Sequence, residues 1–314
     1  MSSEFKTVRV AVVGIGSWGK AIVKTLRNEV SDVQLSHVVT SNSEVAPLLP
    51  EQTKILASWD ELVTHSDEFD CVVAALPPHL NLPLAQLLLP LGIPLFMEKP
   101  LALSAQDAHT VLSLATRHQS IVHIDHIDLY NPAVVEIAAR LNSPVTSVSG
   151  KIGAAYPRRA IMRPLWEYSP HFIAASLKLV ASRPISISAC YDNIAPELLD
   201  QTQRELVTVT IRFENGAQAT IQAGNGMINK TRMLTVSATN QQFEFVDRGT
   251  VPLKENNKEI AVDPTLPLAK SLAHFVNKVR TGDNSLTDFS EGIRVIEILE
   301  AADRALDERR EVKL

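Results

Sequence analysis

One stretch near the N-terminus decides the fold, and it reads Val8-Arg9-Val10-Ala11-Val12-Val13-Gly14-Ile15-Gly16-Ser17-Trp18-Gly19. The β-branched run is typical of a strand buried on both faces, and residues 20–26 predict a helix after the glycines. At this spacing Gly14 permits a tight turn, Gly16 leaves room for a pyrophosphate, and Gly19 lets the helix pack on the strand. N–H groups at the helix N-terminus would bind the phosphates. We expect a dinucleotide site that includes Gly14, Gly16, Ser17, Trp18 and Gly19, and a glycine-rich turn without a ligand is the alternative.

The end of the second predicted strand, residues 34–40, bears on the choice of cofactor. NAD sites usually place an acid there for the ribose hydroxyls, whereas this chain has Thr40, Ser41 and Asn42 and no acid before Glu44. Hydroxyl and amide side chains suit a 2′-phosphate better than an acid would, although no arginine stands in the turn to bind one. We expect NADP in preference to NAD, with a merely polar turn as the alternative.

The first half continues as strands alternating with helices, which predicts an α/β fold with a doubly wound parallel sheet. The expected strands are residues 69–75, 93–97 and 121–124, and the expected helices are 83–91 and 104–117, with a capping box at Ser58-Trp59-Asp60-Glu61. Ligands of such sheets bind at the carboxyl ends of the strands. We therefore expect Leu76 and Pro77 to line the cofactor, together with Glu98 and Lys99, and we interpret His79 as a surface residue.

Lys99 follows an apolar strand in the stretch Leu95-Phe96-Met97-Glu98-Lys99-Pro100. Lysine is costly to bury unless it is paired, so Lys99 indicates either chemistry or a salt bridge.

The second half changes to short strands of mostly alternating polarity at residues 145–151, 185–190, 206–213, 218–222 and 233–237. Asn215-Gly216 is a strong hairpin signal. Alternation predicts an open, mainly antiparallel sheet with one covered face. An uncovered face often becomes an interface, so we expect a homodimer or homotetramer. The alternative is a sheet covered by the last two predicted helices, residues 268–280 and 290–309. Residues 311–314 predict a final short strand or a cap.

Two segments between the halves are rich in ionisable groups. The first runs from His123 to Pro132, but strand alternation places His123 and Asp125 on one face and His126 and Asp128 on the other, so we expect no metal site there. The second contains Arg158, Arg159 and Arg163, which would hold a substrate phosphate or form surface ion pairs.

Glu167 and His171 stand four residues apart in the second segment, so they share a face if a helix begins before His171. Pro170 fits a first helical turn. A carboxylate beside an imidazole orients the ring for proton transfer. A capping or core histidine is the alternative for His171.

The totals describe an ordinary globular protein of 314 residues with net charge −5, which offers no electrostatic attraction for nucleic acid. Cys71 and Cys190 stand alone in apolar contexts and predict reduced core residues of a cytoplasmic protein. The polar N-terminus lacks the apolar segment of a signal peptide, and the most apolar window, residues 82–97, is too broken by prolines to span a membrane.

Taken together, these motifs resemble the Gfo/Idh/MocA family, named for glucose–fructose oxidoreductase, inositol dehydrogenase and a rhizopine-catabolism enzyme. The resemblance covers essentially the whole chain and rests most specifically on Glu98-Lys99-Pro100. It implies a Rossmann domain, expected over residues 1–124, and an α+β domain that carries substrate binding and oligomerisation, expected over 125–314. It also implies that Lys99 contacts substrate and nicotinamide, and that His171 matches the acid/base histidine of the family's Asp-x-x-x-His pattern.

The chain departs from the family pattern in three places. Glu167 replaces the usual aspartate, Leu129 replaces an arginine often found two residues before Asn131, and Pro77-Pro78-His79 replaces the commoner Pro-Asn run, with Asn81 in place of a histidine. These departures weaken any transfer of substrate identity.

The reaction that this reading predicts is hydride transfer between a nicotinamide and a carbinol carbon of a sugar, sugar phosphate or nucleotide sugar. Lys99 would stabilise the alkoxide and His171, held by Glu167, would accept the proton. Tyr130, Asn131 and Arg163 would contact the substrate. The alternatives are a reductase of an imine or conjugated double bond, and a regulatory protein that senses NAD(P) without catalysis.

Overall fold

The computed structural model describes the whole chain except residues 1–6, 157–161, 195, 199–203 and 248–251. The chain forms two compact units: the first is Met1–Asp125 with Leu266–Ile293, and the second is His126–Thr265 with Arg294–Leu314. The sequence expectation of a single boundary near residue 124 therefore differs from the structure, because a late segment returns to the first unit. That segment contains helix α7 (Pro267–Thr281), whose apolar face packs on α1 (Ser17–Glu29) and on strand β1.

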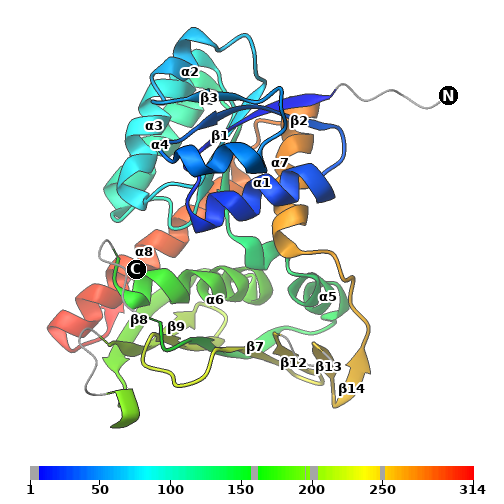
Figure 1. The fold of residues 1–314 in the computed structure, drawn as a ribbon. Helices are drawn as coiled ribbons and strands as arrows, with labels where there is room; N and C mark the ends of the chain where they lie inside the picture. The colour runs from blue at the N-terminus through cyan, green and yellow to red at the C-terminus, as the bar shows by residue number, and fades with distance from the viewer. Residues whose placement is uncertain (1–6, 157–161, 195, 199–203, 248–251) are drawn as a thin grey trace. The chain divides into compact units, whose positions relative to one another are not determined.

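The first unit is built on a six-stranded sheet in the order β3-β2-β1-β4-β5-β6, in which every neighbouring pair is parallel. Its strands are β1 (Val8–Val13), β2 (Val33–Val39), β3 (Lys54–Leu56), β4 (Cys71–Ala74), β5 (Leu95–Glu98) and β6 (Val122–Asp125). The burial of β1 and β4 on both faces explains their continuous apolar sequence. The predicted doubly wound sheet is confirmed (Figure 1).

Helices α1 and α7 pack on each other, as do α3 (Asn81–Leu88) and α4 (Ala105–His118). Short helices complete the unit: α2 (Glu61–Thr64), η1 (Ser43–Leu48), η2 (Pro78–Leu80) and η3 (Leu89–Leu91). The expected capping box is present in part, since Glu61 Oε1 accepts the Ser58 backbone N–H at 3.0 Å. The Ser104 hydroxyl caps α4 by accepting the Asp107 N–H at 3.1 Å.

The second unit is built on a nine-stranded sheet in the order β14-β13-β12-β11-β7-β10-β9-β8-β15, antiparallel throughout except for β7 and β10. Its strands are β7 (Val145–Gly153), β8 (Pro184–Tyr191), β9 (Leu206–Phe213), β10 (Gln218–Gly224), β11 (Thr231–Ala238), β12 (Gln242–Val246), β13 (Leu253–Glu255), β14 (Lys258–Ile260) and β15 (Val312–Lys313). The open, mainly antiparallel sheet is confirmed. The sequence pattern did not predict β12, β13 or β14, and the last two are only three residues long.

One face of this sheet is covered by α6 (Pro164–Val180), which packs on β7, β9 and β10, and α5 (Pro132–Arg140) packs on β12. A Cβ at Gly150 would lie 2.7 Å from the Phe172 ring, so this glycine lets α6 approach the sheet. Along β9 the buried positions alternate with half-buried Thr208 and Thr210. The remaining elements of the unit are η4 (Ile127–Tyr130), η5 (Pro196–Leu198) and the later part of α8 (Thr287–Glu308).

Two further sequence expectations need correction. Helix α7, which the alternative for the second sheet counted among its covering helices, belongs to the first unit. Cys71 is a free core cysteine as expected, but the free Cys190 is exposed rather than buried. It lies in β8 beyond Ile187, where the pairing of β8 with the short strand β15 has ended.

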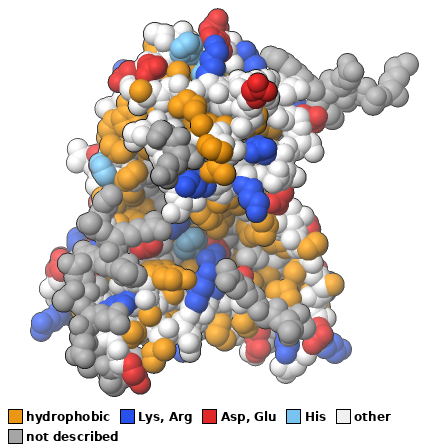
Figure 2. Space-filling model, viewed as in Figure 1, with side chains coloured by type: hydrophobic (Ala, Val, Ile, Leu, Met, Phe, Trp, Pro, Cys, Tyr) orange, Lys and Arg blue, Asp and Glu red, His pale blue; other side chains and the backbone are white. Residues whose placement is uncertain are grey.

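The described helices include none with the length and apolarity needed to cross a lipid bilayer. On the face drawn in Figure 2, acidic and basic side chains are interspersed. This mixture agrees with the small net charge of −5.

Candidate functional site

The glycines that follow β1 have the distinct roles that their spacing predicts. Gly14 has φ +86°, and a Cβ there would lie 2.6 Å from the Ala75 carbonyl oxygen. A Cβ at Gly19 would lie 2.0 Å from the Gly14 carbonyl oxygen, so helix and turn meet only because both residues are glycine. Around Gly16 no atom lies within 4 Å of the added Cβ position. Gly16 therefore leaves the open space that a pyrophosphate requires.

Helix α1 begins directly after this opening. Gly16 caps it without a side-chain hydrogen bond, and its first turn has no acidic residue. The first bond back to Gly16 comes from the Lys20 N–H at 3.0 Å, so the amides of Ser17, Trp18 and Gly19 precede the helical ladder. This arrangement fits the phosphates of a dinucleotide.

A cavity of about 660 Å³ opens beside the glycine turn within the first unit. Its lining includes Gly14, Gly16, Thr40, Ser41, Asn42 and Leu76, so the structure brings together residues expected to bind cofactor from three separate strand ends. Ser58, Trp59 and Asp60 also line it, and the sequence identified them only as a helix start. Their position after β3, the neighbour of β2, is the signal that could have found them. Pro77 lies next to this lining as the cap of η2.

The Glu98–Pro100 turn is held by polar contacts at the carboxyl end of β5. The Trp18 indole Nε1–H donates to Glu98 Oε1, and the Lys99 backbone N–H donates to Glu98 Oε2 at 3.1 Å. Buried Asn81 donates from Nδ2 to the carbonyls of Glu98 at 3.3 Å and Leu101 at 3.0 Å. Trp18 and Glu98, both expected at the cofactor site, are therefore joined directly, and the backbone of Lys99 is fixed beside them.

Glu98 also faces Asp125, its register partner on β6. Asp125 Oδ1 accepts the Ser271 hydroxyl at 2.7 Å, and His123 Nε2 lies 3.0 Å from the same hydroxyl. His123 and Asp125 thus share a face, as strand alternation predicted. Asp125 Oδ2 has no donor among the described residues. Burial first, and then the Glu98 carboxylate, raises the pKa of Asp125 well above its usual value, so one proton shared with Glu98 satisfies both carboxyls.

In the second unit, His171 lies within α6, which begins at Pro164. Pro170 is therefore interior to the helix and not in its first turn, because Pro164 already occupies the helix start. His171 Nδ1 lies 2.6 Å from Asp128 Oδ2, and the Arg232 guanidinium on β11 donates to Asp128 Oδ1. The guanidinium carbon lies 5.8 Å from the centre of the Phe172 ring.

Asp128 is fully buried, with an exposed fraction of 0%. Burial alone would raise its pKa, but the charges of Arg232 and His171 hold the pKa of Asp128 below its usual range. The ionised carboxylate accepts a proton-bearing Nδ1 from His171, which leaves Nε2 as the basic nitrogen of the neutral ring. This is the geometry of an oriented general base.

The carboxylate found on His171 Nδ1 is thus Asp128 and not the expected Glu167. Glu167 stands half-buried one turn earlier on the same helix face. The sequence reading excluded Asp128 because it was considered only as part of a metal cluster. Asp128 stands three residues before Asn131, which the sequence predicted to contact the substrate, and this closeness in the chain was the signal that could have identified it.

Two residues expected to contact substrate lie close to Asp128 in the chain. Asn131 caps α5, since its Oδ1 accepts the Ala133 N–H at 2.9 Å, and it is 8% exposed. Tyr130, the last residue of η4, is half-buried. The capping bond uses one lone pair of Asn131 Oδ1 and leaves its amide nitrogen available to donate to a substrate.

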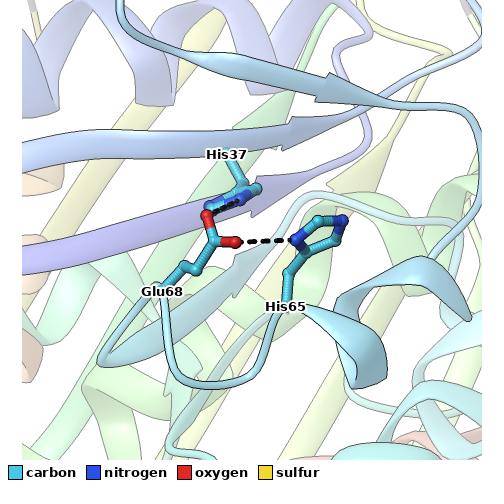
Figure 3. Close-up of side chains that lie close together, drawn as sticks. All are labelled: His37, His65 and Glu68. Carbon is cyan, nitrogen blue, oxygen red and sulfur yellow. Dashed lines mark hydrogen bonds and ion pairs between the residues drawn. The ribbon is translucent and has the colours of Figure 1, made fainter.

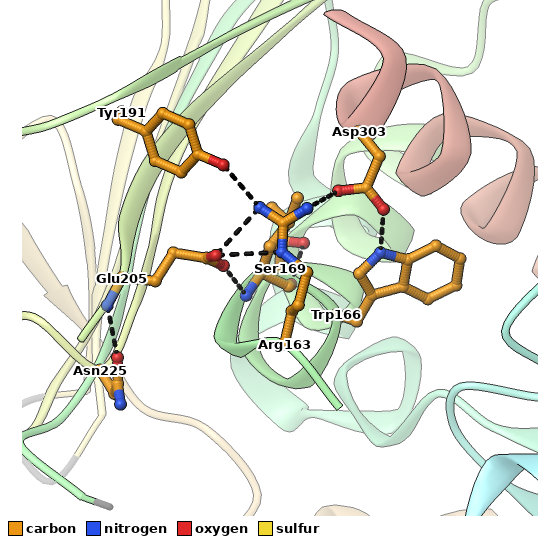
Figure 4. A network of polar contacts seen from close by, with 8 residues as sticks. Arg163, Trp166, Ser169, Tyr191, Glu205, Asn225 and Asp303 are labelled. Atoms are coloured by element: carbon orange, nitrogen blue, oxygen red, sulfur yellow. Dashed lines mark hydrogen bonds and ion pairs between the residues drawn. The ribbon is translucent and has the colours of Figure 1, made fainter. Parts of the chain in front are cut away.

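Arg163 is enclosed by an ion-pair network within the second unit (Figure 4). Its Nε and Nη2 donate to Glu205 at 3.0 and 2.9 Å, and Nη1 donates to Asp303 at 2.5 Å. Tyr191 and Trp166 complete the network. These bonds favour the ion-pair interpretation of Arg163 over a phosphate contact. Arg158 and Arg159 lie outside the described residues.

Comparison with known proteins finds oxidoreductases similar to this chain. The sequence pattern of the Gfo/Idh/MocA oxidoreductase family, with its NAD-binding Rossmann fold, matches residues 8–126. UDP-N-acetylglucosamine 3-dehydrogenase of Acidithiobacillus ferrooxidans is 22% identical over 305 residues, covering 92% of this chain and 94% of that protein.

Solved structures extend the likeness to both units. One described as an oxidoreductase of Magnetospirillum magnetotacticum has a TM-score of 0.86 and 26% identity, covering 95% of this chain and 100% of that one. The fold is also that of GenD2 from gentamicin A biosynthesis, solved in complex with NAD, with a TM-score of 0.80, 20% identity and coverage of 98% and 97%. Residues 8–126 therefore carry the NAD-binding Rossmann pattern of this oxidoreductase family, and both units have the fold of the solved relatives.

Proposed function

We propose that this protein is an NAD(P)-dependent dehydrogenase that oxidises a carbinol carbon of a sugar, sugar phosphate or nucleotide sugar, or catalyses the reverse reduction. The observation that carries the proposal is the imidazole of His171 held at 2.6 Å by the buried carboxylate of Asp128. An imidazole oriented in this way is suited to remove a proton from a hydroxyl group.

Each of the proposed site residues has a distinct role in the reaction. His171 Nε2 accepts the hydroxyl proton, and Asp128 stabilises the imidazolium that forms. Lys99, an ammonium in the first unit, stabilises negative charge on the substrate oxygen. A nicotinamide, when bound, would supply the hydride acceptor at its C4 carbon. Tyr130 and the amide nitrogen of Asn131 orient the substrate, while Glu167 lines the same helix face as His171.

The proposed substrate class is supported by the relative that matches almost the whole chain, whose name specifies a nucleotide sugar. Arg163 is not part of the proposed phosphate recognition, because three of its nitrogens already donate to carboxylates.

NADP is the cofactor we propose as preferred. Thr40, Ser41 and Asn42 line the cavity with hydroxyl and amide groups, which can bind a 2′-phosphate. Asp60 lines the same cavity and opposes that preference by its charge. Dissociation constants for NADP and NAD, measured on the apoprotein by intrinsic fluorescence, decide between them; tighter binding of NAD would refute the preference.

We also propose assembly into a homodimer or homotetramer through the uncovered face of the nine-stranded sheet. That face carries exposed Ser149 and Lys151 and half-buried Thr210, Thr220 and Gln222. Light scattering of the full chain tests it, and a monomer at micromolar concentration would refute it. The free cysteines fit the reducing cytoplasm that we propose as its location.

The test of activity is a substrate panel in both directions with each cofactor, followed by nicotinamide absorbance. The panel contains free sugars, inositols, sugar phosphates and nucleotide sugars. It also contains cyclic imines and enones, which are the substrates of the alternative reductase activity. Alcohol oxidation that falls strongly in His171→Gln and in Lys99→Met supports the proposal. Turnover of imines or enones alone would refute the sugar assignment, and cofactor binding without turnover of any substrate would refute the enzyme.

A further inference from the structure

Among the residues that the structure describes, His37, His65 and Glu68 have ligand atoms that all lie within 4.8 Å of one another. They lie in the first unit and outside the lining of the cofactor cavity. His37 comes from β2, His65 caps the end of α2, and Glu68 lies in the turn before β4 (Figure 3). Strand β2 and the segment from His65 to Glu68, which are distant in sequence, thus bring two imidazoles and a carboxylate together.

His37 is the most informative member of this cluster because it is 1% exposed. Its Nδ1 lies 3.1 Å from the Ser36 hydroxyl oxygen, and that hydroxyl donates its own proton to the Val10 carbonyl at 3.1 Å. The hydroxyl can therefore only accept from the ring, so Nδ1 carries the proton. In the neutral ring, Nε2 then presents a bare lone pair.

That lone pair points at another acceptor. His37 Nε2 lies 3.5 Å from Glu68 Oε2 and has no hydrogen-bond donor among the described residues. A lone pair facing a carboxylate oxygen at this distance is the arrangement that a cation between them would satisfy.

From this geometry we infer a divalent transition-metal site, best suited to Zn²⁺, with His37 Nε2, His65 Nδ1 and one Glu68 carboxylate oxygen as its ligands. Bonds of about 2.0–2.2 Å in a tetrahedral site separate ligand atoms by roughly 3.3 Å. His65 Nδ1 lies 3.0 Å from Glu68 Oε1 and His37 Nε2 lies 3.5 Å from Glu68 Oε2, so the two oxygens of the carboxylate face one imidazole each, at separations on either side of that value. Water would occupy the fourth position.

The surroundings supply what such a site needs outside its ligands. The Ser36 hydroxyl fixes the Nδ1–H tautomer of His37, which is the usual role of a hydrogen-bond partner behind a metal-bound histidine. The Phe69 ring packs edge-on against His37 at 5.7 Å between centroids and limits its rotation. His65 is a third exposed, so water and metal can reach the cluster.

Lys54 competes with the metal, because its ammonium forms an ion pair with Glu68 Oε2. The Lys54 side chain is 53% exposed and can leave the carboxylate for solvent. Metal binding would then exchange one positive charge for two at the same carboxylate. This competition makes Lys54 a matched control, since its removal should strengthen the site while removal of a ligand should weaken it.

The proposed metal would link two segments that continue into the lining of the cofactor cavity, one after β2 and one before α2. His37 precedes the lining residues Val39–Asn42 along β2, and His65 follows the lining residues 57–60 by way of α2. A metal bound to both histidines would join β2 to the end of α2. We expect a structural role, because the ligands are not among the residues proposed for catalysis.

The test uses the untagged full chain, stripped of metal with a chelator and titrated with Co²⁺ as a spectroscopic probe. We expect one equivalent to give the visible absorption of tetrahedral Co²⁺, and Zn²⁺ to displace it. His65→Gln should weaken Zn²⁺ binding at least about a hundredfold, Ser36→Ala about tenfold, and Lys54→Met should strengthen it. His109→Gln, at an exposed position of α4 in the same unit, should change nothing.

Thermal unfolding gives a second measurement that does not depend on activity. Added Zn²⁺ should raise the melting temperature of the wild type and of Lys54→Met, but not of His65→Gln. Absence of a Co²⁺ spectrum in the wild type, or Zn²⁺ affinity unchanged in both His65→Gln and His37→Gln, would overturn the inference. In that case the cluster is an ion-pair group of His65, Glu68 and Lys54 alone.

Discussion

Asp128 Oδ2 lies 2.6 Å from His171 Nδ1, although the two residues are 43 positions apart in the chain. Arg232 donates to the other oxygen of the same carboxylate. A fully buried carboxylate is costly unless both of its oxygens find donors, and here one cation and one imidazole supply them. When the pair accepts a proton from a substrate, the imidazole of His171 therefore takes it up and the carboxylate of Asp128 stays ionised.

Replacing Asp128 by Asn should reduce kcat by about a hundredfold or more, because the amide can donate to Nδ1 and favour the tautomer that lacks a basic Nε2. Cofactor affinity should remain unchanged, since Asp128 does not line the cofactor cavity. Steady-state kinetics with the best substrate of the panel measures the loss. Glu167→Gln is the matched comparison, and a larger loss there than in Asp128→Asn would return the orienting role to Glu167.

Asp128 should also contribute to acid stability. A carboxyl whose pKa is lowered by folding stabilises the protein above its unfolded pKa, near 3.8, and this contribution is lost as the pH falls toward the folded value. Melting temperatures from pH 6 down to about pH 3 should therefore fall more steeply for the wild type than for Asp128→Asn. Parallel curves would show that Asp128 titrates alike in both states.

The sequence predicted the parallel sheet, the glycine turn and the open second sheet because each depends on local pattern: β-branched runs, glycine spacing and period-two alternation. It did not predict Asp128 as the partner of His171, because that contact joins η4 to α6 and leaves no spacing in the sequence. Glu167, four residues from His171, was the only carboxylate that helical spacing could offer.

The glycine turn allows folding and cofactor binding to be separated. Gly16→Ala should fold with an unchanged melting temperature, because nothing lies within 4 Å of its new methyl group, yet it should bind dinucleotide at least about tenfold more weakly. Gly14→Ala should instead lose about 1–3 kcal/mol of stability from its φ of +86° alone. Calorimetric unfolding and dinucleotide titration measure the two effects. Equal losses of stability in both variants would contradict the proposed division of roles.

The shared proton of Glu98 and Asp125 predicts the opposite pH trend from Asp128. Burial raises the pKa of both carboxyls, so the folded state holds a proton that the unfolded chain releases. The stability contribution is present below the unfolded pKa and declines as the pH rises through the folded pKa. The melting temperature of Asp125→Asn should therefore exceed that of the wild type increasingly at alkaline pH. A constant difference between pH 5 and 9 would contradict a shared proton.

Tertiary contacts also explain why Arg163 and residues 266–293 were assigned differently from the sequence. Arg163 stood in an arginine-rich segment, but its partners Glu205 and Asp303 lie 42 and 140 residues further along the chain. The late helix α7 has an apolar face that suits either unit, and only its contacts with α1 and β1 show which one it covers. An amphipathic pattern predicts that a helix packs against a sheet through its apolar face. It does not predict which sheet the helix packs against.

Arg163→Met should destabilise the second unit by about 2–3 kcal/mol, between the values for exposed and buried ion pairs, because it leaves two partly buried carboxylates facing each other. Glu205 must also continue to accept the Leu165 N–H at 2.9 Å, near the start of α6. Denaturant unfolding measures the loss, and Arg183→Met, which removes an exposed ion pair with Glu214, is the matched control and should change little. If Arg163→Met were as stable as the control but raised KM for phosphorylated substrates alone, Arg163 would bind phosphate and the network in Figure 4 would not be its main role.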